Sequence, residues 1–498
     1  MKLTKIALAV ACLVGSVQAF AAVVTPAQIS AAQSAGTLQQ AWISGASASA
    51  KSIYEGWVGS GAGVGCDPGT NTIYSNQATS NTAVTPGSIG NFNAYACTRG
   101  GVVSVLYHTL DGGSLYAYAP HTKGAKLARV KFAGTGNGCS TTALSYTDTT
   151  DSNNNSTVFK GCTLVGTALP ATGVPTAAGN SANAAAVAGD ALAPQLPVGG
   201  FSDVEASILP STLGGGDVSS FGTEGQAYIG QVFGVVVSTP LYRALQTAQG
   251  VSASAISADT TFDPAIAPNI TSAQYVSIAA QGGAYQTDWS PILGSAGTGH
   301  KVILARRVDT SGTQASSNAF FLKNPCASGV AANLNPAVSA NSTSTFEVFE
   351  GSGTGNVKTR ITTAANSTGT DNFAVGVVSL ENNWRTESAA NAGYRFVKLD
   401  GNHPETGDVV NARLTATSGA YPFHMETRNF TANSATGFGA LVVGQITSAL
   451  ANPPSTSCSV LGRGLTLNPL GGSSCTVGVQ VAKGTNLGNS CSPIQLTQ

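Results

Sequence analysis

Short apolar runs alternate with turns rich in Gly and Ser along most of the chain. Gly230 to Val237 is an apolar run of strand length, typical of a strand buried on both faces of a sheet. Ser238 to Leu245 follows with a cap, an early proline and apolar helical spacing, and Gly250 is a stop signal. The same order recurs from Lys301, where a short apolar strand, a turn and a helix precede Pro325. Strands followed directly by helices predict an α/β fold and count against an all-β adhesin.

Other segments predict further elements around these two units. Between Asp67 and Ala96 no period is sustained, so a long loop is expected there. Leu115 to Gly200 is interpreted as an insertion, because much of it has the composition of a linker. The sequence also predicts helices over Thr25–Gln40, Ser52–Trp57 and part of Thr431–Leu450, and strands over Ala41–Ala50, Gly101–Tyr107 and Asn372–Leu380.

The N-terminus has the pattern of a secretory signal peptide over residues 1–21. Lys2 and Lys5 precede an apolar stretch from Ile6 to Val17, and small residues suited to cleavage follow. Export agrees with the cysteines, because the mature chain keeps an even number that we expect to form four disulfides. We predict that Cys66 pairs with Cys97 and Cys139 with Cys162; the others are Cys326, Cys458, Cys475 and Cys491.

The low charge of the chain limits the kinds of molecule that it is expected to bind. Charged residues make up 9% of the chain and the net charge is zero, which implies neither nucleic acid nor an anionic membrane surface as a partner. No histidine has metal-like spacing, so we expect no metal and no cofactor. No Gly-x-Ser-x-Gly elbow or paired acidic constellation is present, which disfavours an enzyme, including a secreted phosphate-ester hydrolase.

The candidate chemistry lies at the turn after the strand from Lys301. Arg307, Val308 and Asp309 are followed by Thr310 and then by Ser311, Gly312 and Thr313, which open the helix. A helix N-terminus presents unpaired amides, so hydroxyls, a glycine and an arginine gathered there suit an anion. The alternatives are that Ser311 or Thr313 only caps the helix and that Arg307 only forms a surface ion pair with Asp309.

These residues resemble the phosphate-binding class of the type II periplasmic binding proteins. The family's strand, Arg-x-Asp turn and Ser-Gly-Thr helix start correspond to Arg307 through Thr313. Other stretches follow in the family's order, namely Trp42–Ser49, Leu110–Ser114, Phe201–Asp203, Phe373–Val378 and Ala420–Phe423. The resemblance implies an α/β fold of two lobes, the periplasmic binding protein type II fold, here with a disulfide-stapled insertion and a C-terminal tail.

The resemblance also implies a ligand site in a cleft between the lobes. Arg307 would grip an oxyanion, and Asp309 would orient Arg307. Asp203 would accept a hydrogen bond from a protonated phosphate oxygen. The alternative for Asp203 is a turn-capping carboxylate beside Ser202. The full set of implied ligand-binding residues is Ser49, Ser114, Asp203, Arg307, Ser311, Gly312 and Thr313.

The sequence therefore predicts an exported, monomeric solute-binding protein that clamps phosphate or a similar oxyanion, for delivery to an ABC transporter. The alternative is a secreted surface or matrix protein that keeps the fold without phosphate binding, which Ser49-Ala50 favours because the family has Thr-Phe there. The expected division is lobe 1 over 22–235 with the insertion 115–200, lobe 2 over 236–372, a return to lobe 1 over 373–450, and a cysteine-containing tail over 451–498.

Overall fold

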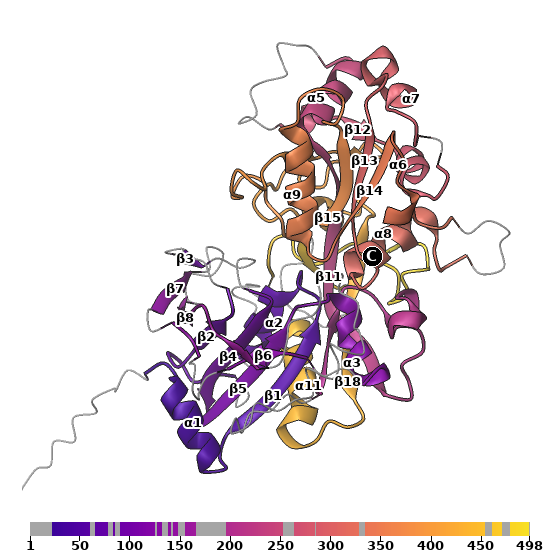
Figure 1. The fold of residues 1–498 in the computed structure, drawn as a ribbon. Coiled ribbons are helices and arrows are strands. Elements are labelled where there is room, and N and C mark those ends of the chain that lie inside the picture. The colour runs from indigo at the N-terminus through magenta and orange to yellow at the C-terminus, as the bar shows by residue number, and fades with distance from the viewer. Residues whose placement is uncertain are drawn as a thin grey trace, which may run out of the picture.

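The computed structural model has two α/β lobes joined through one continuous sheet (Figure 1). The expected signal peptide, Cys458 and Cys475 lie outside the residues that the structure describes. These residues are 22–59, 65–77, 83–84, 90–124, 127–131, 138–140, 143–147, 155–165, 196–251, 263–283, 285–327, 334–453, 461–470 and 479–497. Among them, no helix is long and apolar enough to cross a membrane.

The first lobe is built on β1 (Gln39–Gly45), which pairs in parallel with both β5 (Val102–Thr109) and β10 (Gly199–Ser202). Helices α2 (Ala50–Val58) and α11 (Gly437–Ala451) pack together over one face of this sheet. The lobe also contains α1 (Pro26–Ser34), β2 (Thr72–Ser75), β3 (Ala83–Val84), β4 (Phe92–Arg99), the 3-10 helix η1 (Ser114–Ala117), α3 (Ala119–Thr122), β6 (Arg129–Val130), β7 (Ala143–Thr147), β8 (Asn155–Phe159), β9 (Leu164–Val165), η2 (Ala206–Ile208), η3 (Ser211–Leu213) and β18 (His424–Ala432).

The second lobe is built on β13 (Val302–Arg307), which is buried at every position and lies in parallel between β14 (Phe346–Gly351) and β15 (Ala374–Ser379). Helix α8 (Gly312–Leu322) follows β13, and α9 (Thr354–Ala365) follows β14. The remaining elements are α5 (Thr239–Ala248), η4 (Pro264–Ile266), β12 (Asn269–Ile270), α6 (Ser272–Ala279), α7 (Ser290–Leu293), η5 (Gly294–Gly297), η6 (Ser339–Asn341), β16 (Tyr394–Phe396), β17 (Lys398–Leu399) and α10 (Leu414–Thr417).

A single long strand, β11 (Gly222–Ser238), passes from one lobe to the other. Its first part pairs with β18, and its last part, from Phe233 to Val237, pairs with β15. The ladder to β18 is irregular between Gln226 and Gly230, and Tyr228 there has a positive φ of 61°. A bulge of this kind bends a strand. β11 changes its partner from β18 to β15 between Val232 and Phe233, just after this bulge, so the junction between the lobes lies there.

The chain returns to the first lobe later than expected. Strand β15 pairs with β13 and with the end of β11, so residues 374–379 lie among the strands of the second lobe. Strand β18 instead joins β10 of the first lobe to β11. We therefore place the return at β18 and not at residue 373.

The expected long loop between Asp67 and Ala96 was wrong, because this region contains β2 and most of β4. β4 pairs antiparallel with β5 through a two-residue turn at Gly100 and Gly101, whose φ values are 56° and 79°. Two central residues with positive φ form the turn whose twist matches a hairpin, and Gly-Gly is one of its sequence signals. The hairpin was therefore indicated by a signal that the polar composition outweighed.

Both predicted disulfides are confirmed. Cys66 is bonded to Cys97, and Cys139 to Cys162, so each closes a loop within the first lobe. A third disulfide joins Cys326 to Cys491 across 165 residues, and no pairing had been predicted for these two. The tail also contributes the strands β19 (Leu465–Leu467), β20 (Gly484–Thr485) and β21 (Gln495–Leu496).

Candidate functional site

The carboxyl ends of the parallel strands of both lobes meet at the junction. In the first lobe, β10 leads directly to Asp203, and the turn after β5 leads to Ser114. In the second, β13 ends at Arg307, which is level with Gly351 at the end of β14. This edge is where open α/β sheets bind ligands.

On the side of the first lobe, Ser114 and Asp203 form one buried pair. The Ser114 hydroxyl donates to Asp203 Oδ2 at 3.0 Å, and the Asp203 amide donates to the Ser114 Oγ at 3.2 Å. Asp203 Oδ1 is buried and has no hydrogen-bond partner in the described part of the chain. It is Ser202, not Asp203, whose side chain accepts from the backbone of the turn, at Val204 N. Asp203 is thus available to a ligand that donates a hydrogen bond.

On the side of the second lobe, Arg307 is buried, with 6% of its surface exposed. Its Nη1 donates to Thr354 Oγ1 and its Nη2 to the carbonyl of Ser352, both at 2.8 Å, while its Nε has no partner. Asp309 does not orient Arg307, as we had expected from the resemblance, because it forms an ion pair with Arg306. The surface ion pair that was the alternative for Arg307 is therefore absent too, within the described residues.

The N-terminus of α8 points its first turn at the same place. Helix geometry leaves the amides of Gly312, Thr313 and Gln314 without partners inside the helix. Ser311 is the N-cap residue, yet its side chain makes no capping hydrogen bond. Ser311 and Thr313 are both buried. The Ser311 side chain therefore does not cap the helix, which was one alternative considered for it.

The two lobes touch at this site. The Leu115 amide of the first lobe donates to the Thr310 carbonyl of the second at 3.0 Å. At Gly312, a Cβ atom would lie 2.2 Å from the Ser114 Oγ and 2.7 Å from Asp203 Oδ2. Any larger residue at position 312 would have to displace these side chains or α8, so glycine permits the closest contact between the lobes here.

Replacing Gly312 by Ala is expected to open this contact. The added methyl group has to displace Ser114, Asp203 or the start of α8, and the hydrogen bond from Leu115 to Thr310 weakens with it. Amide hydrogen exchange at Leu115 should then accelerate at least about tenfold, the change produced by about 1.4 kcal/mol. Gly355→Ala is the matched control, because it also lies in a first helical turn but has nothing within 4 Å. Unchanged exchange in Gly312→Ala would contradict this role.

Ser49 is less closely tied to the group than the other predicted residues. It is the N-cap residue of α2, which starts at the same edge of the first lobe after β1. Its hydroxyl is buried and has no hydrogen-bond partner. Among the described residues, then, hydrogen bonds and close contacts join Ser114, Asp203 and Gly312, and Ser49 lies outside that set.

Sequence reasoning missed three groups at this site. Ser352 and Thr354 hold Arg307, and Ser352-Gly353-Thr354 repeats the Ser-Gly-Thr helix start of residues 311–313 after the neighbouring strand. That repetition was a signal in the sequence. Glu381 follows the end of β15 at the same edge, and its charge interacts with those of Asp203 and Arg307. A single glutamate after a strand does not by itself indicate a ligand site in the sequence.

Burial sets the ionisation of these groups. It raises the pKa of Asp203 to about 6, although the Ser114 hydrogen bond and the charge of Arg307 oppose the shift. Burial also raises the pKa of Glu381 to about 7, and the charge of Asp203 adds to that effect. Burial lowers the pKa of Arg307 to about 10, so the guanidinium remains charged at neutral pH. Around pH 6 to 7 the site therefore changes its charge.

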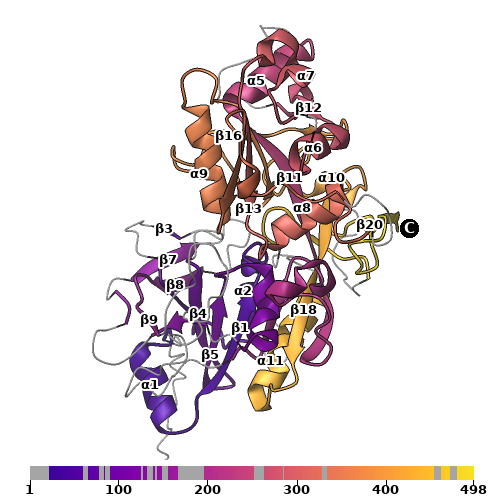
Figure 2. The same ribbon diagram turned by 45° about the vertical axis from the view of Figure 1, so that its right-hand side comes forward.

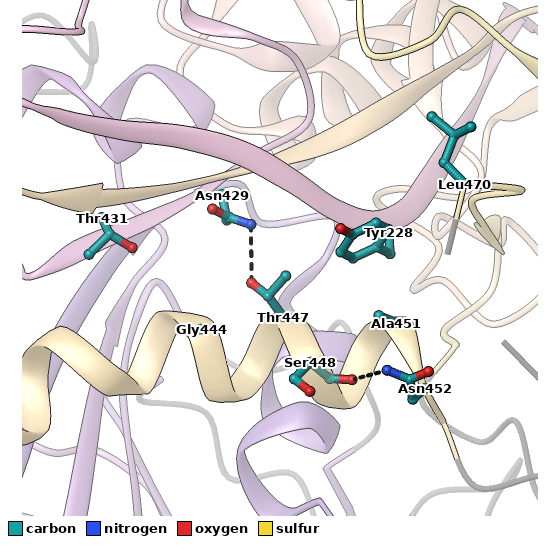
Figure 3. A pocket seen from close by; sticks show the side chains of 9 residues that line it. All are labelled: Tyr228, Asn429, Thr431, Gly444, Thr447, Ser448, Ala451, Asn452 and Leu470. Carbon is teal, nitrogen blue, oxygen red and sulfur yellow. Dashed lines mark hydrogen bonds between the residues drawn. The ribbon is translucent and has the colours of Figure 1, made fainter. Parts of the chain in front are cut away.

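A separate pocket of about 420 Å³ lies between α11 and the strands β11 and β18 (Figure 3). Asn429 donates to the Thr447 hydroxyl inside it, and Tyr228 at the bulge of β11 forms part of its wall. None of the predicted site residues lines this pocket, and no charged side chain is among the described residues that line it. It is not suited to holding a small anion.

Comparison with family models and with curated proteins finds no match. Two solved structures show a weak likeness. One is a substrate-binding protein assigned to phosphate ABC transport from Clostridium perfringens, with phosphate bound, at 14% identity over 45% of this chain and 65% of that chain, with a TM-score of 0.25. The other is an ABC-type phosphate transport receptor from Vibrio cholerae, at 13% identity over 50% and 72%, with a TM-score of 0.28. The first match spans less than two thirds of the protein it matches, and superpositions this poor assign neither a ligand nor a partner to this chain.

Proposed function

We propose that this protein is an exported solute-binding protein whose lobes enclose a small tetrahedral oxyanion, phosphate being the first candidate. One observation carries the proposal: the buried Arg307, whose Nε has no partner among the described residues, lies at the edge where α8 starts. Helix geometry leaves the first amides of α8 without partners inside the helix. A buried guanidinium and helix-terminal amides provide charge-assisted hydrogen bonds to an anion. Delivery of the ligand to an ABC transporter is part of the same proposal.

Asp203 supplies the selectivity in this proposal. Its Oδ1 has no partner among the residues that the structure describes and accepts a hydrogen bond from a ligand oxygen that carries a proton. An anion without a proton leaves the carboxylate unpaired and is repelled by it. Phosphate is therefore favoured over sulfate wherever Asp203 is ionised.

A second candidate function is a surface or matrix role without ligand. The observation that favours it is the direct contact of Ser114 and Asp203 with Gly312, because the lobes already touch where the ligand would lie. Titration calorimetry with phosphate separates the two candidates. Heat of binding below about 1 mM phosphate supports the first, since a site of only about −4 kcal/mol is half filled there. Absence of binding from about pH 5 to about pH 8 supports the second, since this range spans the ionisation of the site's carboxyls.

The same calorimetry, repeated with sulfate, is expected to show a loss of binding as the pH rises. Sulfate does not change its charge over this pH range, so a change of its affinity with pH reflects ionisation of the protein. Because the pKa values of Asp203 and Glu381 are raised to about 6 and about 7, both carboxyls are neutral below this window and ionised above it. Sulfate affinity should fall by up to about tenfold per pH unit above about pH 6 for each linked proton.

Asp203→Asn should keep sulfate bound at higher pH, because the amide never acquires the repelling charge. Asp217→Asn is the control, since Asp217 is an exposed carboxylate of the same lobe that accepts from the Ser219 amide. Sulfate binding that is independent of pH in the unmodified protein would exclude this role for the two carboxyls.

A further inference from the structure

The C-terminal segment lies against both lobes at their junction (Figure 2). We define residues 479–497 as the clasp. Its attachment to the second lobe is covalent, because Cys491 is bonded to Cys326, which closely follows α8. The Cα atoms of these two residues are 5.1 Å apart. The disulfide therefore attaches the clasp to the turn that follows α8.

Ser490, the residue just before Cys491, forms hydrogen bonds with the first lobe. The Ser490 amide donates to Glu205 Oε1 and the Ser490 hydroxyl to Glu205 Oε2, both at 2.6 Å. Glu205 follows β10 and is 5% exposed, so its carboxylate is held within the lobe. Hydrogen bonds to a buried carboxylate are among the stronger ones in proteins.

Further contacts join the clasp to β18 near the bulge. The Gly488 amide donates to Glu426 Oε2 at 2.7 Å, and the Thr485 hydroxyl donates to Glu426 Oε1. The carbonyl of Gly484 lies 3.2 Å from His424 Nε2. Upstream in the tail, β19 pairs with β11 from Ile229 to Gln231, at the same junction. The tail thus reinforces the strands on which the lobes would turn.

The clasp residue that contacts the first lobe and the one bonded to the second lobe are adjacent in the chain. Ser490 and Cys491 are adjacent residues, and one trans peptide bond spans about 3.8 Å between Cα atoms. Separation of the lobes at this edge therefore requires loss of the Glu205 contacts, since the disulfide does not yield. A hinge opening that separates Cys326 from Glu205 therefore has to break these contacts.

We propose that the clasp holds the two lobes in contact in the absence of ligand. If the proposed function is correct, on which this consequence rests, the protein exchanges its anion slowly and retains it. The clasp itself does not depend on that function, because its contacts involve no ligand.

Energy transfer between two dyes tests the proposal on the full-length mature protein. The dyes are attached through non-canonical residues at Ser34 in α1 and Ala248 in α5, which are exposed. Helices α1 and α5 lie at the far ends of the two lobes (Figure 1). The ligand-free protein should show one population of high transfer efficiency, and the double variant Cys326→Ser, Cys491→Ser should gain a second population of lower efficiency.

Two further variants make the result specific. Glu205→Ala keeps the disulfide and removes the Ser490 contacts with the first lobe, which are the clasp contacts nearest to the disulfide, so it should also gain the second population. The double variant Cys139→Ser, Cys162→Ser is the control, because that disulfide lies within the first lobe, and it should resemble the unmodified protein. An unmodified protein that already shows both populations would overturn the proposal. So would a clasp double variant and Glu205→Ala that both stay closed.

Phosphate at about 1 mM, added to the clasp double variant, distinguishes the clasp from the proposed function. Return of the opened molecules to high transfer efficiency supports both. Opening that phosphate does not reverse supports the clasp and counts against the proposed function.

Discussion

Replacement of Arg307 by Ala is expected to abolish measurable phosphate binding. The buried guanidinium is held by Thr354 and Ser352, and its Nε is left for a ligand. Truncating one partner of a buried, hydrogen-bonded charge pair costs about 2 to 5 kcal/mol, which weakens binding between about thirtyfold and a few thousandfold. Titration calorimetry with phosphate measures the change.

Arg307→Lys and Arg360→Gln complete this experiment. Lysine keeps the charge but lacks the planar fork, so Arg307→Lys should recover only part of the affinity. It also preserves a test if the alanine variant does not fold. Arg360 pairs with the partly exposed Glu347 in the second lobe, and its loss should leave binding unchanged. A folded Arg307→Ala protein with undiminished affinity would exclude Arg307 from the site.

Replacement of Glu405 by Ala is expected to cause a large loss of stability. The Glu405 side chain is fully buried and accepts two hydrogen bonds from Arg385, at 2.9 and 3.2 Å, and a further one from Arg463. Removing one member of a buried ionic group leaves charges uncompensated and costs about 3 to 5 kcal/mol. Chemical denaturation should show that decrease in the free energy of unfolding.

Loss of Glu405 also affects the tail, because Arg463, which donates to Glu405, belongs to it. Arg463 donates to the carbonyls of Leu380 and Asn382, on either side of Glu381.

Glu347→Ala is the matched control for Glu405→Ala, since Glu347 also pairs with two cations, Lys301 and Arg360, but is 24% exposed. We expect it to cost about 1 kcal/mol or less. A similar decrease in the free energy of unfolding of both variants would show that burial does not strengthen the contribution of Glu405 to stability.

Local signals were enough for the elements that carry the candidate site. The strand from Val302 and the helix from Gly312 were predicted from an apolar run, a turn and a helix start that follow one another along the chain. Propensity and capping act over a few residues, so such units can be identified from sequence. The Gly100-Gly101 hairpin was of the same kind, and there the signal was present but overlooked.

The assignment of Asp309 was wrong because neighbouring side chains of a strand point to opposite faces. Arg306 and Arg307 are adjacent at the end of β13, and either could have paired with Asp309. In the fold, Arg306 takes Asp309, and Arg307 turns to Thr354 and Ser352, which are 47 and 45 residues later. Which face looks toward the other lobe depends on how β13 is placed in its sheet.

Local sequence signals were sufficient for the α/β class, for the strand, turn and helix around Arg307, and for the two disulfides that close short loops. Each of these depends on residues that are near one another along the chain. The contact of Gly312 with Ser114 and Asp203, the place of Glu381 and the Cys326–Cys491 bond depend on the packing of the lobes. These join segments that are distant in sequence, and the cysteines of the mature chain allow roughly a hundred pairings, so only the packing of the two lobes selects among the alternatives.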